Sequence, residues 1–181
     1  PTATTQVIIG TGTYACTYDE ASAATIIDLT VNSGATFNFA DADSDLNILT
    51  NITNNGTINH SGAGYLNISS TGTFTKGGAA TNTTVKLKAT GNVTLASNSD
   101  IYDVKIPSGG SLSLSTYTLE TYAFDNDGTF NCNTGTLQVE GPIGGLDFST
   151  GTFNENTGTV HFKPGDTWAA VDQTVPSETY Y

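Results

Sequence analysis

Apolar and polar residues alternate in short runs along the chain, and most runs follow a glycine. The repeating unit is glycine, a small polar residue and then an apolar/polar/apolar triplet. Alternation with a period of two is typical of half-buried strands. The first apolar residues of successive units follow one another at intervals of 21, 16, 19, 19 and 18 residues; they are Phe37, Ile58, Phe74, Val93, Leu112 and Phe130.

A second set of apolar runs lies between these units, at residues 26–31, 46–48, 65–68, 85–87 and 104–106. Residues 128–139 and 151–162 are near duplicates, identical at eight of twelve positions. A spacing near 19 residues fits one coil of a parallel β-helix, in which neighbouring coils satisfy each other's backbone hydrogen bonds. We therefore expect an all-β, single-domain parallel β-helix (β-solenoid) of about nine coils at the usual strand spacing. The alternative is a β-sandwich or jelly roll.

The solenoid repeats are expected over residues 25–165, with β-prone segments at residues 1–24 and 166–181. No stretch shows helical periodicity over three turns, so the pattern predicts no helical cap. The end of a solenoid has unpaired backbone groups that must be capped or paired with another chain. We expect both flanking segments to be candidate inter-subunit contacts, and a cap of irregular loop is the alternative.

The amino-acid composition limits the classes of partner that the chain is expected to bind. Charged residues are 12% of the chain and the net charge is −12, with five lysines and no arginine. Binding to nucleic acid or to an anionic membrane surface relies on clustered cations, so neither partner is expected. No apolar run approaches the roughly 20 residues that span a bilayer. The lack of methionine is what we expect of a chain processed from a longer one, as in a mature secreted protein at the cell surface.

Several segments resemble the repeats of large microbial cell-surface and adhesin-like β-solenoid proteins, for example residues 28–38, 51–59 and 151–160. The resemblance implies an exported structural or adhesive role and brings no catalytic residues. We expect a structural subunit of an extracellular filament or appendage. It would assemble with itself head-to-tail through the solenoid ends or terminal strands. The alternative is an adhesin or glycan-binding module, including a phage-type fibre domain.

Three alternating carboxylates, Asp41, Asp43 and Asp45, form a candidate calcium site, because Ca²⁺ prefers several oxygen ligands. Leu46 and Ile52 stand where an EF-hand loop would need glycine and glutamate, so the pattern is compatible only with a simpler surface site. A solvated acidic turn is the alternative. No other cofactor is expected.

Six asparagines begin Asn-x-Ser/Thr sequons and are candidate glycosylation sites. All lie in a stretch, residues 46–99, that contains no acidic residue and holds three lysines; they are Asn51, Asn55, Asn59, Asn67, Asn82 and Asn92. The stretch is interpreted either as a glycosylated region or as a patch that packs against acidic parts of a neighbouring copy. Simple composition bias is the third interpretation.

Catalysis and disulfide formation are not expected. His60 and His161 are isolated from candidate nucleophiles and are interpreted as ladder or surface residues. Cys16 and Cys132 would lie about six coils apart in a solenoid, about 29 Å, which is too far for a disulfide. Flat aromatic side chains could bind a glycan; they are Trp168, Tyr14, Tyr18, Tyr65, Tyr102, Tyr117, Tyr122, Tyr180 and Tyr181.

Overall fold

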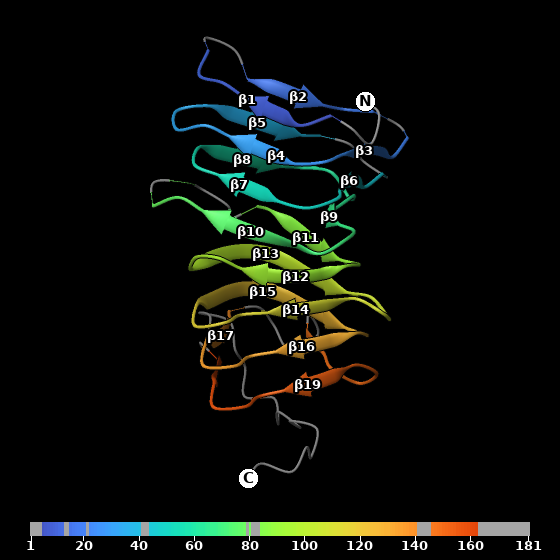
Figure 1. Ribbon diagram of the computed structural model, residues 1–181, viewed down its shortest axis with the longest axis vertical. Helices are drawn as coiled ribbons and strands as arrows, with labels where there is room; N and C mark the ends of the chain where they lie inside the picture. The colour runs from blue at the N-terminus through green and yellow to red at the C-terminus, as the bar shows by residue number, and fades with distance from the viewer. Residues whose placement is uncertain are drawn as a thin grey trace.

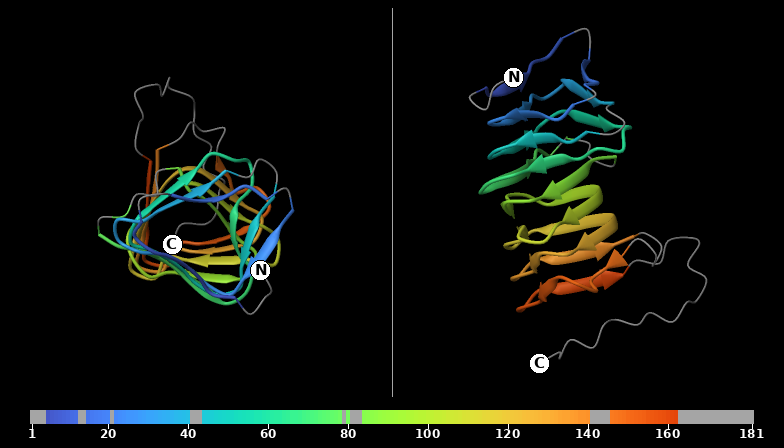
Figure 2. Two further views of the ribbon diagram at one scale, coloured as in Figure 1. Left: turned by 90° about the horizontal axis from the view of Figure 1, so that it is seen from above. Right: turned by 90° about the vertical axis from the view of Figure 1, so that its right-hand side faces the viewer.

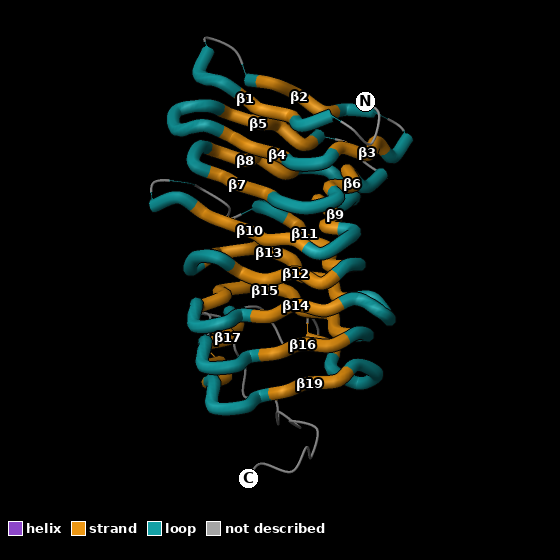
Figure 3. Tube along the Cα trace, viewed as in Figure 1, coloured by secondary structure: helices purple, strands orange, loops and turns teal. Residues whose placement is uncertain are grey.

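The chain winds as a parallel β-solenoid of about seven turns (Figure 1). The computed structural model describes residues 5–12, 15–20, 22–40, 44–78, 80, 84–140 and 146–162. Within these ranges Figure 3 shows only strands joined by loops and turns. Every strand pairing is parallel, which excludes the alternative of an antiparallel sandwich. The described residues form about seven turns rather than the nine coils expected of the chain, because most coils use 20 to 23 residues instead of 19, as the pairings Leu66↔Leu87 and Leu29↔Ile52 show.

The strands form three sheets. The eight-stranded sheet contains, in spatial order, β1 (Val7–Ile9), β4 (Leu29–Val31), β7 (Ile52–Asn54), β10 (Gly72–Lys76), β12 (Asn92–Leu95), β14 (Ser111–Ser113), β16 (Thr129–Asn131) and β19 (Thr152–Asn154). The three-stranded sheet contains β2 (Cys16–Tyr18), β5 (Thr36–Phe39) and β8 (Thr57–His60). The nine-stranded sheet contains β3 (Ala24–Ile26), β6 (Leu46–Ile48), β9 (Leu66–Ile68), β11 (Lys86–Ala89), β13 (Ser99–Ile106), β15 (Thr118–Asn126), β17 (Thr136–Val139) and β20 (Thr159–Phe162), with β18 (Leu146–Asp147) beside β15.

Two long strands turn a corner of the solenoid. The first half of β15 pairs with β17, and its second half pairs with β18. β13 pairs with β15 along both halves, and its second half continues the column of β9 and β11. The coils are therefore three-sided at both ends of the molecule, and the view along the solenoid axis in Figure 2 shows this outline. The alternation slips at the corner, where Tyr102 and Asp103 are both outward, as are Tyr122 and Ala123.

The apolar units found in the sequence are strands, but they do not form a single column. Phe37 and Ile58 lie in β5 and β8 of the three-stranded sheet, whereas Phe74 and Val93 lie in β10 and β12 of the eight-stranded sheet. The interval of 16 residues falls where the series passes from one sheet to the other. The 16-residue interval therefore reflects a change of column, while the coils themselves also vary in length, from 17 residues between Lys86 and Asp103 to 23 between Leu29 and Ile52.

Inward-facing side chains fill the solenoid with one continuous core. Leu66, Phe74, Leu87 and Val104 of the middle coils are fully buried. The two cysteines are not bonded to each other: Cys16 is exposed in β2, and Cys132 is buried after β16. Over the described ranges, no helix is long and apolar enough to cross a bilayer.

Candidate functional site: a polar network on the nine-stranded sheet

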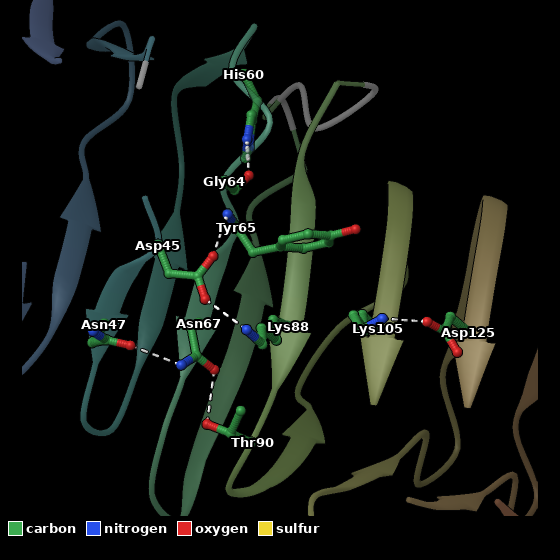
Figure 4. A network of polar contacts seen from close by, with 10 residues as sticks. All are labelled: Asp45, Asn47, His60, Gly64, Tyr65, Asn67, Lys88, Thr90, Lys105 and Asp125. Atoms are coloured by element: carbon green, nitrogen blue, oxygen red, sulfur yellow. Dashed lines mark hydrogen bonds and ion pairs between the residues drawn. The ribbon is translucent and has the colours of Figure 1, made fainter. Parts of the chain in front are cut away.

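The outward face of the nine-stranded sheet carries a polar network that runs across β6, β9, β11, β13 and β15 (Figure 4). Leu46, Leu66, Leu87 and Val104 face inward at matched positions of successive coils. Side chains alternate along a strand, so the residue before each of these faces outward. The outward residues stack in a column: Asp45, Tyr65, Lys86 and Asp103.

Two contacts in this network reach past the adjacent coil. The Lys88 ammonium lies 2.8 Å from Asp45 Oδ2, although Lys88 belongs to β11 and Asp45 precedes β6. The Tyr65 hydroxyl donates to Asp103 Oδ2 at 2.8 Å, which joins the coil of β9 to that of β13. Each of these two contacts therefore fastens one coil to the second coil beyond it. The backbone amide of Tyr65 also donates to Asp45 Oδ1 at 2.9 Å, which ties neighbouring coils together at the same carboxylate.

A second column lies two residues further along the same strands. Asn67 Nδ2 donates to Asn47 Oδ1 at 2.8 Å, and the Thr90 hydroxyl donates to Asn67 Oδ1 at 2.9 Å. Lys105 lies 2.5 Å from Asp125 Oδ2 on the neighbouring coil. These contacts give the outward polar side chains partners on neighbouring coils along the solenoid axis.

Burial sets the protonation states at the centre of the network. Burial raises the pKa of Asp103, while the hydrogen bond from Tyr65 and the charges of Lys86 and Lys105 act in the opposite direction. Burial also raises the pKa of Tyr65, and the hydrogen bond to Asp103 raises it further. Tyr65 therefore stays protonated and donates to the Asp103 carboxylate, so it is not poised as a nucleophile.

His60 is buried between the coils of β8 and β11. Its Nε2 lies 2.7 Å from the Gly64 carbonyl, and its Nδ1 lies 3.2 Å from the backbone amide of Lys86. The carbonyl can only accept and the amide can only donate, so His60 is neutral with its proton on Nε2. Burial lowers the pKa of His60 to about 4. The histidine was expected at a ladder or surface position. It is buried rather than on the surface, and it packs in register on Phe39 of the neighbouring coil, with ring centroids 4.4 Å apart.

The lysines of the acid-free stretch are engaged within the molecule. Lys76 lies 2.5 Å from Asp100 Oδ1, and Lys88 pairs with Asp45; both carboxylates lie just outside residues 46–99. Lys86 donates to the Gly62 carbonyl at 2.9 Å. The stretch therefore uses its cations to join coils, which weakens its interpretation as a patch for the acidic parts of a neighbouring copy.

Only one of the three candidate calcium ligands, Asp45, lies among the described residues. The Asp45 carboxylate contacts Lys88 and the Tyr65 amide, while Asp41 and Asp43 lie outside the described residues. Among the described residues, no three His, Cys, Asp or Glu side chains come close enough together to hold a metal ion.

The asparagines of the described sequons differ in their burial and in their hydrogen bonds. Asn67 is buried within its ladder, and Asn51 donates to Asp28 while accepting from Thr73. Asn59 and Asn92 are exposed, Asn55 is half-buried, and Asn82 lies outside the described residues. A glycan is attached through Nδ2, which Asn51, Asn59 and Asn67 use to donate within their ladders. Asn92 is exposed and accepts from Ser111 through Oδ1, so it is the described sequon whose hydrogen bond a glycan would disturb least.

The tyrosines also separate into groups. Tyr102 and Tyr122 are each 42% exposed and stack at the corner of β13 and β15, with centroids 5.1 Å apart. Tyr65 belongs to the network, and Tyr18 accepts from the Ala24 amide through its hydroxyl. Tyr117 packs against the core. Four of the expected aromatics lie outside the described residues: Tyr14, Trp168, Tyr180 and Tyr181.

The Tyr65→Phe variant tests the network. It removes the hydroxyl that Asp103 accepts from and leaves that partly buried carboxylate with one partner fewer. We expect the free energy of unfolding to fall by about 1–3 kcal/mol. Tyr102→Phe is the matched control, because Tyr102 is exposed at the corner. Chemical denaturation of both variants measures the difference, and equal stability of the two would contradict a structural role for the Tyr65–Asp103 bond.

Comparison of the sequence with family models and with curated proteins, and of the chain with solved structures, finds no match. The fold and the network define a class: a parallel β-solenoid whose coils are fastened by polar contacts along its axis. The ring nitrogens of His60 are engaged, and three of the four described lysines pair with carboxylates, two of them in this network and Lys76 beside it. The arrangement serves to hold coils together.

Proposed function

We propose that this chain is a structural subunit of an extracellular filament or cell-surface appendage that assembles head-to-tail through the ends of the solenoid. The observation that carries the proposal is the incomplete burial of the core in the end coils. Val7 and Ala24 at one end, and Phe153, Val160 and Phe162 at the other, are only partly buried although they face inward. Equivalent residues of the middle coils are fully buried.

The backbone edges support the same proposal. Within the described residues β1 pairs with β4 alone, and β19 pairs with β16 alone. Every internal coil stacks on the next in parallel with the chain running in one direction. The last coil of one copy therefore presents the kind of edge that the first coil of another can continue. Such a contact uses two different surfaces and does not close on itself.

Electron microscopy of the purified chain tests the proposal. We expect fibres with a regular axial repeat, and we expect Val160→Asp to raise the concentration at which they form at least tenfold, because it places a charge in the half-open core. Thr159→Asp is the matched control, since Thr159 is exposed beside it in β20. Monodisperse monomers of the wild-type chain at high concentration would overturn the proposal.

The second candidate function is a glycan-binding or adhesive module, and the Tyr102–Tyr122 pair favours it. Among the described residues the exposed large apolar side chains are Ile8, Tyr102 and Tyr122, and two of the three are stacked together. Exposed tyrosines offer an apolar ring and a polar hydroxyl to a sugar. Microscopy separates the two functions, because a tip module would form discrete particles whereas a subunit would form fibres.

A further inference from the structure

The outward side of the eight-stranded sheet, which we call face A, carries far fewer charges than the outward side of the nine-stranded sheet. Each of its eight strands, taken with the residue before it in β1, β4 and β7, presents two outward side chains, and thirteen of these sixteen are threonine, serine or asparagine. Asp28 is the one charged residue among them, although the chain has a net charge of −12. The sixteen are Gln6, Ile8, Asp28, Thr30, Asn51, Thr53, Thr73, Thr75, Asn92, Thr94, Ser111, Ser113, Thr129, Asn131, Thr152 and Asn154.

Many polar groups on face A already bond to one another along the solenoid axis. Gln6 and Asn51 both donate to the Asp28 carboxylate, at 3.3 and 3.1 Å, and the Thr73 hydroxyl donates to Asn51 Oδ1 at 2.9 Å. Further along, Asn154 donates to Asn131 at 2.8 Å. Covering a polar group is costly mainly when it loses its hydrogen bonds. The ladders of face A would keep their hydrogen bonds if a second molecule covered them.

Three of the remaining hydroxyls form a regular row on the N-terminal half of face A. Thr30, Thr53 and Thr75 are paired in register on successive strands, and none of them bonds to another described residue through its hydroxyl. Neighbouring strands lie about 4.8 Å apart. A second copy of this chain carries the same row, so the two rows have the same repeat over these three strands.

We propose that face A is a lateral docking surface for a second copy of this chain, so that two solenoids pair face to face. Charge supports this partner, since two copies with a net charge of −12 repel least where their uncharged sides meet. The outward side of the nine-stranded sheet carries Lys105, Asp125 and Asp147 in one row and suits self-contact less well. The contact is isologous and does not depend on head-to-tail assembly.

The size of face A sets the expected strength. Eight strands by three residues give about 38 Å by about 10 Å, so the pair would bury about 800 Å² in projection. Stable interfaces start at about 1,200 Å², so pairing of single copies should be weak and reversible. Where copies are also joined end to end, the same contact repeats along the axis and its strength multiplies.

Sedimentation equilibrium of the full chain carrying Val160→Asp, which weakens end-to-end assembly, tests the proposal from micromolar to millimolar concentration without interference from fibres. We expect a monomer–dimer equilibrium that strengthens as salt is added, because salt screens the repulsion. The variant with both Thr53→Glu and Thr94→Glu should raise the dissociation constant at least tenfold. Ser61→Glu with Ser108→Glu adds the same charge in exposed turns and is the matched control, expected to leave the constant unchanged.

Thermal unfolding of each variant shows whether it is folded. If the double variant loses cooperative unfolding, Thr94→Glu alone carries the test with an expected fivefold effect. Val160→Asp chain that stays monomeric at millimolar concentration and high salt would overturn the proposal, as would equal association by the face A variants in that background. Fibres that persist in the face A variant without Val160→Asp would support end-to-end assembly while separating it from lateral pairing.

Discussion

Gly72→Ala is expected to lower the free energy of unfolding by about 3 kcal/mol or more, because the added Cβ would overlap the backbone of the neighbouring coil. That Cβ would lie 1.6 Å from the Thr50 carbonyl oxygen. Both atoms are fixed by the backbone, so no side chain can move aside. Relief requires the two coils to separate, and this breaks the pairing of β10 with β7.

The same contact recurs along the chain, and it explains why most apolar units begin with glycine. An added Cβ would lie 1.9 Å from the Ser70 carbonyl at Gly91 and 2.5 Å from the Gly110 carbonyl at Gly128. We therefore expect the loss of stability to decrease in the order Gly72→Ala, Gly91→Ala, Gly128→Ala. Urea denaturation of the series measures it.

Gly78→Ala is the matched control for this series. Nothing lies within 4 Å of an added Cβ at Gly78, which is exposed six residues from Gly72. We expect its stability to change by less than about 1 kcal/mol, because alanine there mainly restricts the unfolded chain. If Gly72→Ala were as stable as Gly78→Ala, the inference that the coils stack too closely at Gly72 and Thr50 to admit a Cβ would be wrong.

The solenoid itself could be predicted because its signals are local. Alternation around Phe74, Val93 and Leu112 gives the inward positions, and the glycine before each triplet marks where coils come close. The number of coils could not be predicted in the same way. It depends on which apolar residues share a column, and Ile58 and Phe74 belong to different sheets although their sequence units look alike.

The network was harder to predict than the fold. Tyr65 and Asp103 are 38 residues apart and meet across two coils, so only the register of β9, β11 and β13 brings them together. No local pattern marks such a pair. His60 is different, because the alternation of Ile58, Asn59 and His60 already places the imidazole inward. That signal was present in the sequence, and the apparent isolation of the histidine obscured it.

Acid is expected to destabilise the fold through His60. Its pKa is about 4 in the folded chain, mainly because of burial, whereas the unperturbed value is 6.5. Between pH 6.5 and 4 the unfolded chain takes up a proton that the folded chain does not, so the free energy of unfolding falls as pH decreases. A shift of this size corresponds to about 3 kcal/mol, lost across that window.

Other groups contribute to the same profile with different signs. The pKa of Asp28 is lowered by hydrogen bonds from Thr50 and Asn51 that outweigh its burial, so protonation of Asp28 removes stability below its unperturbed value of 3.8. The pKa of Asp103 is raised by burial, so its contribution increases stability as pH falls. A comparison of variants is therefore needed to isolate the histidine.

His60→Gln makes that comparison, because the glutamine amide offers an N–H donor group and a carbonyl acceptor but does not titrate in this range. The variant should lose the decline in stability between pH 6.5 and 4 that the wild-type chain shows. His161→Gln, at an exposed position of β20, shows how much of the change comes from removing any imidazole. Denaturation midpoints at several pH values measure all three chains. If His60→Gln and the wild-type chain showed the same pH dependence, His60 would not be the group that destabilises the fold in acid. Protonation of Nδ1 would then not disturb the bond from the Lys86 amide that joins β8 to β11.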